Sequence, residues 1–215
     1  MNKFMLVALA TVGCGLAFAQ PANYIDLGNI GDIDPNYQTE DAFSDMDAFG
    51  AGQIKWFKFT FGGTNGTVNY LDIDTINVAG FTGGTTPVDT EIGLYDNLGN
   101  RIADDDDDGY GLFSSLSFGA PGSRNFTQSG TMSARGPLGN GRDGVLASGT
   151  YWLAVGQFNA AFGNTNWTVT STGTGDVDRS RLAFRTDVAA VPEPFSVVAM
   201  GAGLLALARR RRNAK

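Results

Sequence analysis

The sequence predicts an all-β protein, and more closely an antiparallel β-sandwich, from two observations. Short runs that alternate apolar and polar residues recur along the chain, and turns rich in Gly, Asn or Asp separate them. No amphipathic helical pattern interrupts these runs between residues 20 and 190. The two ends differ, because each carries an apolar stretch beside positive charge. We therefore expect a sandwich flanked by an N-terminal signal helix and a short C-terminal hydrophobic helix.

The clearest core strand is expected at residues 53–61, where Phe57, Phe59 and Phe61 share one face. Aromatic residues at every second position give a strand one wholly apolar face, which suits packing against a second sheet. Two long loops are expected, at residues 28–52 and 119–149. Further strands are expected at residues 24–27, 67–81, 89–96, 101–103, 112–118, 148–156, 166–170 and 182–185.

Residues 1–19 have the three parts of a secretory signal peptide. Lys3 lies in the positive segment, residues 4–12 form the apolar segment, and Ala17 and Ala19 are the small residues of a cleavage site. We expect the general secretion machinery to export the chain and signal peptidase to cut it after Ala19. Residues 20–190 then form one exported domain, long enough to bury a sizeable core.

The single cysteine, Cys14, lies inside this leader. Thr11–Cys14 also matches a weak lipobox, so lipidation of Cys14 is the alternative to removal of the leader. Cleavage after Ala19 would remove Cys14. The exported domain would then contain no disulfide, although its compartment would permit one.

Residues 191–215 have three parts in series. The prolines of the first part end any incoming strand, because they lack an N–H donor and fix φ. The uncharged run 195–208 would rise about 21 Å as a helix, which is short of the roughly 30 Å hydrocarbon core. Positive charge stays on the cytoplasmic side of a membrane, so the final part sets the orientation. The first part is Pro192, Glu193 and Pro194, and the last, in residues 209–215, is led by Arg209, Arg210, Arg211 and Arg212.

This order of motif, apolar run and arginines resembles the PEP-CTERM sorting tail of Gram-negative bacteria. The resemblance implies recognition and cleavage by an exosortase, a membrane-embedded cysteine transpeptidase. It also implies a transient inner-membrane intermediate, followed by the cell envelope, the outer surface or an extracellular polysaccharide matrix. The alternative is an ordinary tail anchor. A buried core helix is disfavoured, because four arginines cannot follow a helix into an apolar interior.

Charge limits the partners of the exported domain. Residues 20–190 contain 9 Lys and Arg against 21 Asp and Glu, a net charge of −12. Phosphate binding needs clustered Lys and Arg, so nucleic acid is excluded as a natural partner. A domain of this charge is instead suited to binding cations.

A run of five aspartates is the strongest candidate for such a site. Asp104, Asp106 and Asp108 precede Gly109 and match the D-x-D-x-D-G opening of a calcium loop. Ser115 stands where an EF-hand needs a bidentate glutamate, so an EF-hand is rejected.

Any calcium site must therefore take further ligands from elsewhere, and Asp96 and Asp89 are the candidates. The alternative is a solvated acidic turn whose repulsion is screened by salt. No cofactor other than structural calcium is expected.

Residues 89–158 resemble the bacterial pre-peptidase C-terminal domain (PPC), a β-sandwich of the jelly-roll kind. The likeness rests on Asp89–Asp96, the following turn, the acidic run, Leu112–Phe118 and Ser148–Gly156. It implies a sandwich that holds calcium, where it does so, with loop carboxylates. This sequence departs from the family in its longer acidic run and in the insertion at residues 119–149.

No motif indicates catalysis, and we expect no enzyme. The chain has no histidine, which excludes His-based triads and imidazole metal sites. It also lacks a nucleophile elbow, a phosphate loop and a dinucleotide fingerprint. A carboxylate pair for glycoside hydrolysis, drawn from the 19 aspartates and the two glutamates of the exported domain, Glu40 and Glu91, is the less favoured alternative.

A second alternative is a carbohydrate-binding module of the extracellular polysaccharide. Trp56, Trp152, Trp167 and Tyr110 could form a flat platform for sugar rings if they were exposed together. The tryptophans lie within strand patterns, where packing against a sheet is the commoner role. The favoured interpretation is an exported, non-catalytic envelope or matrix protein whose sandwich binds calcium.

Overall fold

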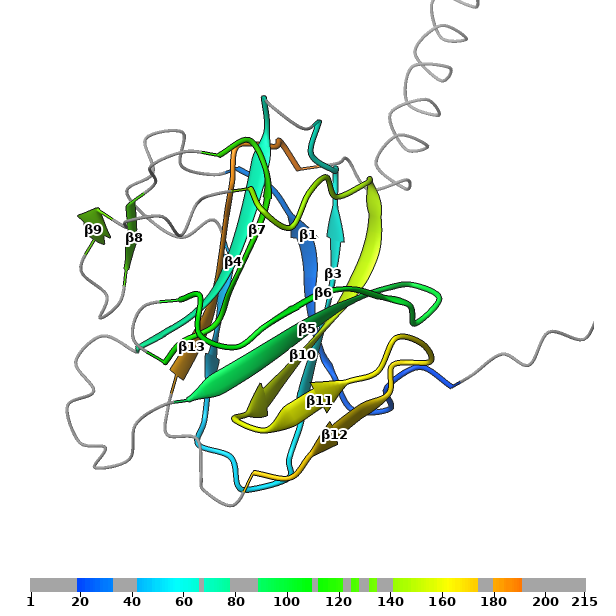
Figure 1. The fold of residues 1–215 in the computed structure, drawn as a ribbon. Coiled ribbons are helices and arrows are strands. Elements are labelled where there is room, and N and C mark those ends of the chain that lie inside the picture. Colours follow the sequence, from blue (N-terminus) through cyan, green and yellow to red (C-terminus); the bar gives the residue numbers. More distant parts are fainter. Residues whose placement is uncertain are drawn as a thin grey trace, which may run out of the picture.

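A computed structural model of the chain describes residues 19–32, 42–65, 68–77, 89–109, 112–121, 125–127, 132–134, 141–173 and 180–190. The regular structure in these residues is entirely β, which confirms the predicted all-β class (Figure 1). Within the same ranges, no helix is long and apolar enough to cross a bilayer. The expected signal helix and C-terminal helix lie outside the described residues.

One sheet has five strands. From edge to edge they are β1 (Ile25–Ile30), β3 (Lys55–Phe61), β10 (Gly149–Gln157), β5 (Thr90–Asp96) and β6 (Arg101–Asp105). All neighbours are antiparallel except β1 and β3, which run parallel. Sequence reasoning expected only antiparallel pairs. The parallel pair arises because the chain crosses to the other sheet between β1 and β3 before it returns.

The second sheet has four antiparallel strands. They are β2 (Ala42–Met46), β13 (Ser180–Thr186), β4 (Tyr70–Asn77) and β7 (Ser115–Gly119), in that spatial order. The prediction of an uninterrupted loop at residues 28–52 was wrong over β2. Its alternation is short and polar, yet Met46 is buried in the core and pairs with Ser180. The exposed face of this edge strand carries Phe43 as well as Asp45, so apolar and polar residues do not separate between its two faces and the strand gives little sequence signal.

Two small hairpins accompany the sheets. β11 (Ala160–Phe162) pairs with β12 (Val169–Ser171), and β8 (Asn125–Thr127) pairs with β9 (Met132–Ala134). The second hairpin lies in the stretch 119–149 that was expected to be loop. The first places Phe162 and Val169 against the outward face of the five-stranded sheet.

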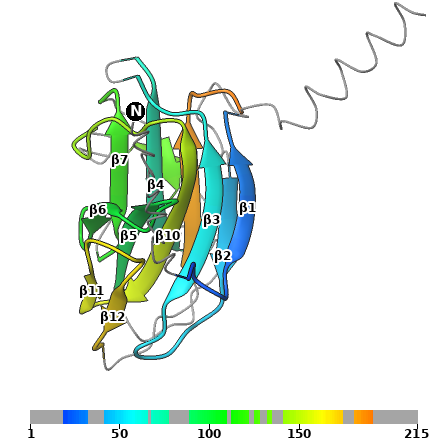
Figure 2. The same cartoon turned by 90° about the vertical axis from the view of Figure 1, so that its right-hand side faces the viewer.

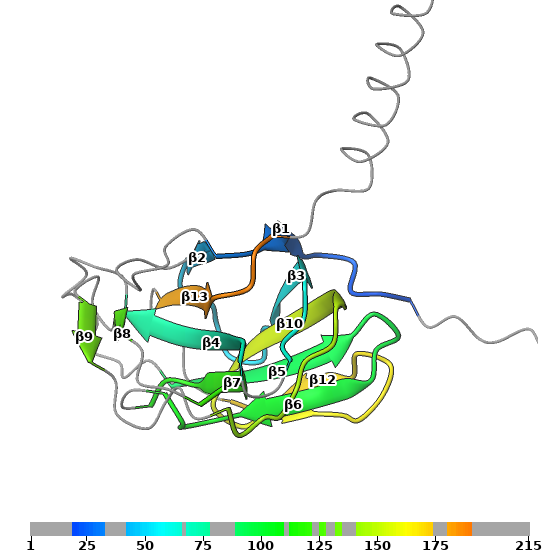
Figure 3. The same cartoon turned by 90° about the horizontal axis from the view of Figure 1, so that it is seen from above.

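The core lies between the two sheets, which face each other when seen from the side and from above (Figures 2 and 3). The predicted core strand is confirmed, since Phe57, Phe59 and Phe61 are at most 1% exposed. Burying each phenylalanine contributes about 1.5–3 kcal/mol, so these three side chains favour packing of β3 against the opposite sheet. The opposite sheet contributes Leu71, Ile73, Leu116, Phe118, Leu182 and Phe184.

Candidate metal centre

The aspartate run is divided between a strand and a turn. Asp104 and Asp105 are the last two residues of β6, and the chain turns at Asp106–Gly109. Asp104 is directed to its own strand, where its carboxylate pairs with Arg101 at 2.9 Å. The strand ending, rather than the D-x-D-x-D spacing, decides which aspartates lie together.

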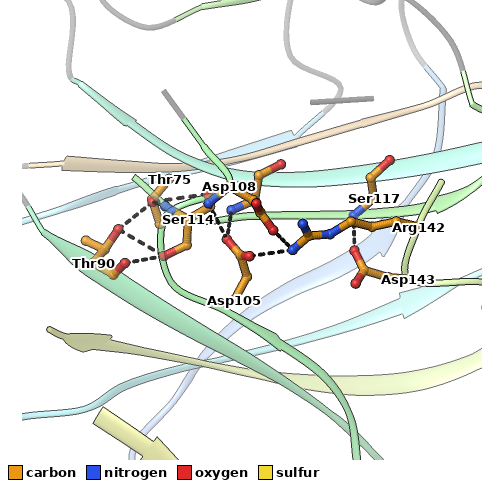
Figure 4. A network of polar contacts seen from close by, with 9 residues as sticks. Thr75, Thr90, Asp105, Asp108, Ser114, Ser117, Arg142 and Asp143 are labelled. Carbon is orange, nitrogen blue, oxygen red and sulfur yellow. Dashed lines mark hydrogen bonds and ion pairs between the residues drawn. The ribbon is translucent and has the colours of Figure 1, made fainter. Parts of the chain in front are cut away.

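Asp105 is the anchor of the turn. Its Oδ2 accepts hydrogen bonds from the backbone N–H of Asp108 at 3.1 Å and of Ser115 at 2.7 Å, and its Oδ1 accepts one from Arg142 Nη2 at 2.8 Å (Figure 4). Burial raises the pKa of Asp105 to about 6, while the Ser115 hydrogen bond and Arg142 act in the opposite direction. The carboxylate is thus buried, and both of its oxygens accept hydrogen bonds.

Arg142 joins this turn to the stretch that follows the long excursion. Its guanidinium also pairs with Asp108, so one cation bridges two carboxylates of the run (Figure 4). The neighbouring Asp143 accepts a hydrogen bond from the backbone N–H of Ser117 at 2.6 Å, which fixes the stretch to β7. The turn is therefore fixed at both of its ends.

A buried hydroxyl cluster links the two sheets beside this turn. Thr75 Oγ1 lies 2.6 Å from Thr90 Oγ1 and accepts a hydrogen bond from the backbone N–H of Ser114 at 2.9 Å. Ser114 Oγ donates to the carbonyl of Thr90 (Figure 4). Because these three residues are at most 1% exposed, their hydroxyls hold β4, β5 and the start of β7 together at a place where apolar packing ends.

The remaining aspartates form the candidate site. Carboxylate oxygens of Asp89, Asp106 and Asp107 lie within 4.8 Å of one another, the one such group of three among the residues that the structure describes. Asp89 immediately precedes Thr90 of the hydroxyl cluster. Oδ1 of Asp89 and Oδ1 of Asp106 are buried and accept no hydrogen bond from any described group. The site therefore presents inward oxygens without a donor to neutralise them.

The electrostatics of the group favour a positive ligand. The pKa of Asp89 is raised by burial and then by the charges of Asp107 and Asp106. The pKa of Asp106 is raised by burial and then by Asp107. Glu91 lies close enough for the charges of Asp106 and Asp89 to raise its pKa further, after burial. A cation bound among these carboxylates would relieve the charge repulsion that, after burial, contributes to these pKa shifts.

The structure brings together part of the sequence-predicted ligand set. Asp106 and Asp89 lie in the group, whereas Asp104 pairs with Arg101 and Asp108 with Arg142. Asp107 was missed, because the D-x-D-x-D template skips every second residue and a tight turn does not. The sequence feature that could have identified Asp107 was its position in the turn directly after the strand.

Asp96 lies in a separate turn. Its Oδ1 accepts hydrogen bonds from the backbone N–H groups of Leu98 and Asn100 at 2.8 Å, and its Oδ2 accepts one from Asn100 Nδ2. Burial acts to raise its pKa, but these hydrogen bonds outweigh burial and lower the pKa below its ordinary value. Asp96 is a turn-forming residue outside the carboxylate group.

The expected sorting and cleavage residues fall at the ends of the chain. Ala19 is the first described residue and is exposed. Those that lie outside the described residues are Ala17, Pro192, Glu193, Pro194, Arg209, Arg210, Arg211 and Arg212.

The tryptophans do not form a flat exposed platform. Trp152 is 0% exposed and meets Trp167, 9% exposed, edge to face at 6.2 Å. Trp56 is half-buried and tilted by 53° against Tyr95. The β11–β12 hairpin covers this face of the sheet, which explains the burial. Tyr110 lies outside the described residues.

Comparison with known proteins adds no family. No family model matches the chain, and no curated protein matches it in sequence. Among solved structures, PliG of Aeromonas hydrophila, a periplasmic inhibitor of g-type lysozyme, superposes with a TM-score of 0.32 and 9% identity. The alignment covers 76% of this chain and 96% of that one. A TM-score this low carries no argument about this chain.

Proposed function

We propose that this chain is an exported, non-catalytic protein of the cell envelope or extracellular matrix, delivered by a PEP-CTERM tail. A leader at residues 1–19 and a tail at residues 191–215 would supply the address. The observation that carries the proposal is the position of the folded body between them. Its described strands begin at Ile25 and end at Thr186, so removal of both segments would leave all of those strands in place.

The body would be a PPC-like sandwich. Residues 89–158, which carry that resemblance, supply β5, β6, β7 and β10. The two stacked sheets and the aspartate turn after β6 agree with a family in which loop carboxylates hold calcium. The parallel β1–β3 pair and the β8–β9 hairpin are additions within this interpretation.

The role of the body would be binding and structure rather than catalysis. The carboxylates of Asp105, Asp108 and Asp104 are held by arginines, and Asp143 by the backbone of β7. No histidine is available to act as a base. The glycan-binding alternative has less support, because Trp152 and Trp167 are buried against each other and Trp56 is half-buried against Tyr95.

Calcium is the ligand we propose for Asp89, Asp106 and Asp107. Calcium prefers six to eight oxygen ligands, and three carboxylates would supply the charge while backbone oxygens and water complete the shell. Its role would be structural, since the group joins the start of β5 to the turn after β6. Binding there would stabilise the body under the calcium concentrations found outside cells.

Cell fractionation tests the sorting function. The full chain should be recovered at the outer surface or in the matrix, and a chain lacking residues 191–215 should be released in soluble form. A matched variant, Pro192→Ala with Pro194→Ala, keeps the apolar run and the arginines but loses the motif. It should remain in the inner membrane at precursor mass. Identical partition of the full and truncated chains would contradict the proposal.

A further inference from the structure

The last residues before the tail are fixed firmly to the body. The backbone N–H of Asp32 donates to the carbonyl of Val188 at 2.9 Å, and the backbone N–H of Tyr70 donates to Asp187 Oδ1 at 2.8 Å. Val188 packs against the core. A Cβ at Gly31 would lie 2.3 Å from the backbone nitrogen of Ala190, so only glycine permits this approach. The chain is thus held in place up to one residue before the tail.

This attachment lies at one end of the sandwich, called here the exit end, with the loop before β4, described at residues 62–65 and 68–69, and the loop at residues 144–148. The backbone N–H of Thr64 donates to the carbonyl of Leu146 at 2.7 Å, which joins those two loops. Tyr70 is the residue after the first loop. Its backbone carbonyl accepts a hydrogen bond from the Thr186 hydroxyl at 2.6 Å. The segments gather at the top of Figure 1.

The exit end carries two exposed apolar side chains. Val68 is 66% exposed and Val145 is 63% exposed, one in each of the joined loops. Isolated exposed valines are common on protein surfaces. These two differ in that they lie in loops at the same end of the body as Val188 and Ala190, after which the predicted tail begins.

The acidic group lies toward the opposite end of the body. Tyr70, the first residue of β4, is at the exit end, whereas Thr75 of the same strand touches Thr90 beside Asp89. Five residues of strand separate these points by about 17 Å. Phe158, 44% exposed, marks this far end, because its backbone N–H donates to the carbonyl of Asp89 at 3.1 Å.

The connector to the membrane is short. Phe195, where the apolar run begins, is five residues beyond Ala190. A fully extended chain spans at most about 3.6 Å per residue, so the connector reaches about 18 Å. Pro192 and Pro194 stiffen it further. Turning the far end of the body toward the bilayer would require a nearly fully extended connector, because the acidic group lies about 17 Å from Tyr70.

We propose that the exit end faces and touches the lipid bilayer while the tail is inserted, with Val68 and Val145 at the headgroup interface. This orientation rests on the membrane intermediate of the proposed function. Burying apolar side chains at that interface is energetically favourable, and acidic groups are repelled by anionic lipids. The orientation keeps the carboxylates of Asp89, Asp106 and Asp107 in the aqueous phase, accessible to calcium.

Fluorescence quenching by lipids tests the orientation. The chain that begins at Gln20 contains no native cysteine, so it would carry one introduced cysteine at a time, labelled with an environment-sensitive dye. Val68→Cys and Val145→Cys are the exit-end variants, and Phe158→Cys is the far-end control. In phosphatidylcholine vesicles with headgroup nitroxides, most fluorescence should be lost at the exit-end sites and little at Phe158. A flexible insertion of about ten residues between Ala190 and Val191 should remove the difference.

Co-sedimentation with the vesicles separates the two ideas. A chain that sediments but is quenched equally at all three sites, or more strongly at Phe158, would overturn the orientation and leave the membrane intermediate intact. A chain that does not sediment would overturn both. Quenching that needs native membranes and does not occur in pure lipid would assign the exit end to a protein partner and overturn the lipid contact.

Discussion

Arg142 donates a hydrogen bond from Nη2 to Oδ1 of Asp105 at 2.8 Å, and so joins two stretches that are 37 residues apart in the chain. The same guanidinium pairs with Asp108. Arg142 therefore neutralises the two aspartates that flank Asp106 and Asp107. The latter pair is left to face Asp89, which is what makes the carboxylate group a candidate cation site.

Removal of Arg142 should destabilise the body. Arg142→Ala would leave the buried Asp105 carboxylate without its cation, at a cost of about 1–3 kcal/mol at neutral pH. Urea unfolding measures the change. The control is Asp104→Asn, which breaks the more exposed Arg101–Asp104 pair and keeps the hydrogen bond from Arg101 to Asn164, with an expected loss of about 0–1 kcal/mol. Equal losses in the two variants would show that the buried pair has no special weight.

Stability should fall as the pH rises through the mildly acidic range. Burial raises the pKa of Asp105 from 3.8 in the unfolded reference to about 6 in the folded state. The folded state therefore holds this proton more tightly than the unfolded chain does. The contribution is present in full below pH 3.8 and is lost as the pH rises through about 6.

Asp105→Asn should make this dependence shallower. Asp89, Glu91, Asp106 and Asp143 also have raised pKa values and titrate in the same direction, so a slope should remain. The urea midpoint of each protein, measured against pH in EDTA, gives the comparison. Superimposable slopes would rule out Asp105 as a contributor.

Calcium should stabilise the body through Asp107 and not through Asp104. Millimolar calcium should raise the melting temperature of the wild-type protein relative to EDTA. Asp107→Asn should reduce that increase, because it removes one of the three convergent carboxylates. Asp104→Asn removes the same charge outside the group and should retain the increase. A wild-type protein that melts identically in calcium and in EDTA would eliminate the site.

Gly99 should tolerate alanine poorly. Its φ is +84°, and an added Cβ would lie 2.7 Å from the Trp167 ring. Gly144 has nearly the same φ, +85°, with nothing within 4 Å of its Cβ position. Both alanine variants should pay about 1–3 kcal/mol for the left-handed backbone, and Gly99→Ala about 1–3 kcal/mol more for overpacking. Thermal unfolding of the pair isolates the ring contact, and equal melting temperatures would contradict it.

Sequence patterns predicted the strands whose buried face can be recognised from their own residues alone. The alternating phenylalanines of β3 predicted a core strand correctly, because apolar residues at every second position are typical of a strand with one buried face. The short edge strand β2 was missed, since only Met46 in it is fully buried and a single residue carries no period. The parallel partnership of β1 and β3 depends on a chain crossing between sheets, which no local pattern reports.

The candidate site was predicted in outline. The aspartate run and Asp89 were identified from composition and motif, and two members of the group came from that set. Which other aspartates join the group depended on where β6 ends and on the ion pairs that Arg142, distant in the sequence, makes with the run. Those are tertiary contacts between distant parts of the chain, so the spacing within the run could not give them.

The most direct test of the account is the intact mass of the protein recovered from the cell envelope. We expect a chain that begins at Gln20 and has lost the apolar run 195–208 and the arginines that follow it. A mass equal to that of the full 215-residue chain, recovered at its final location, would contradict export through a cleaved leader and sorting through a cleaved tail.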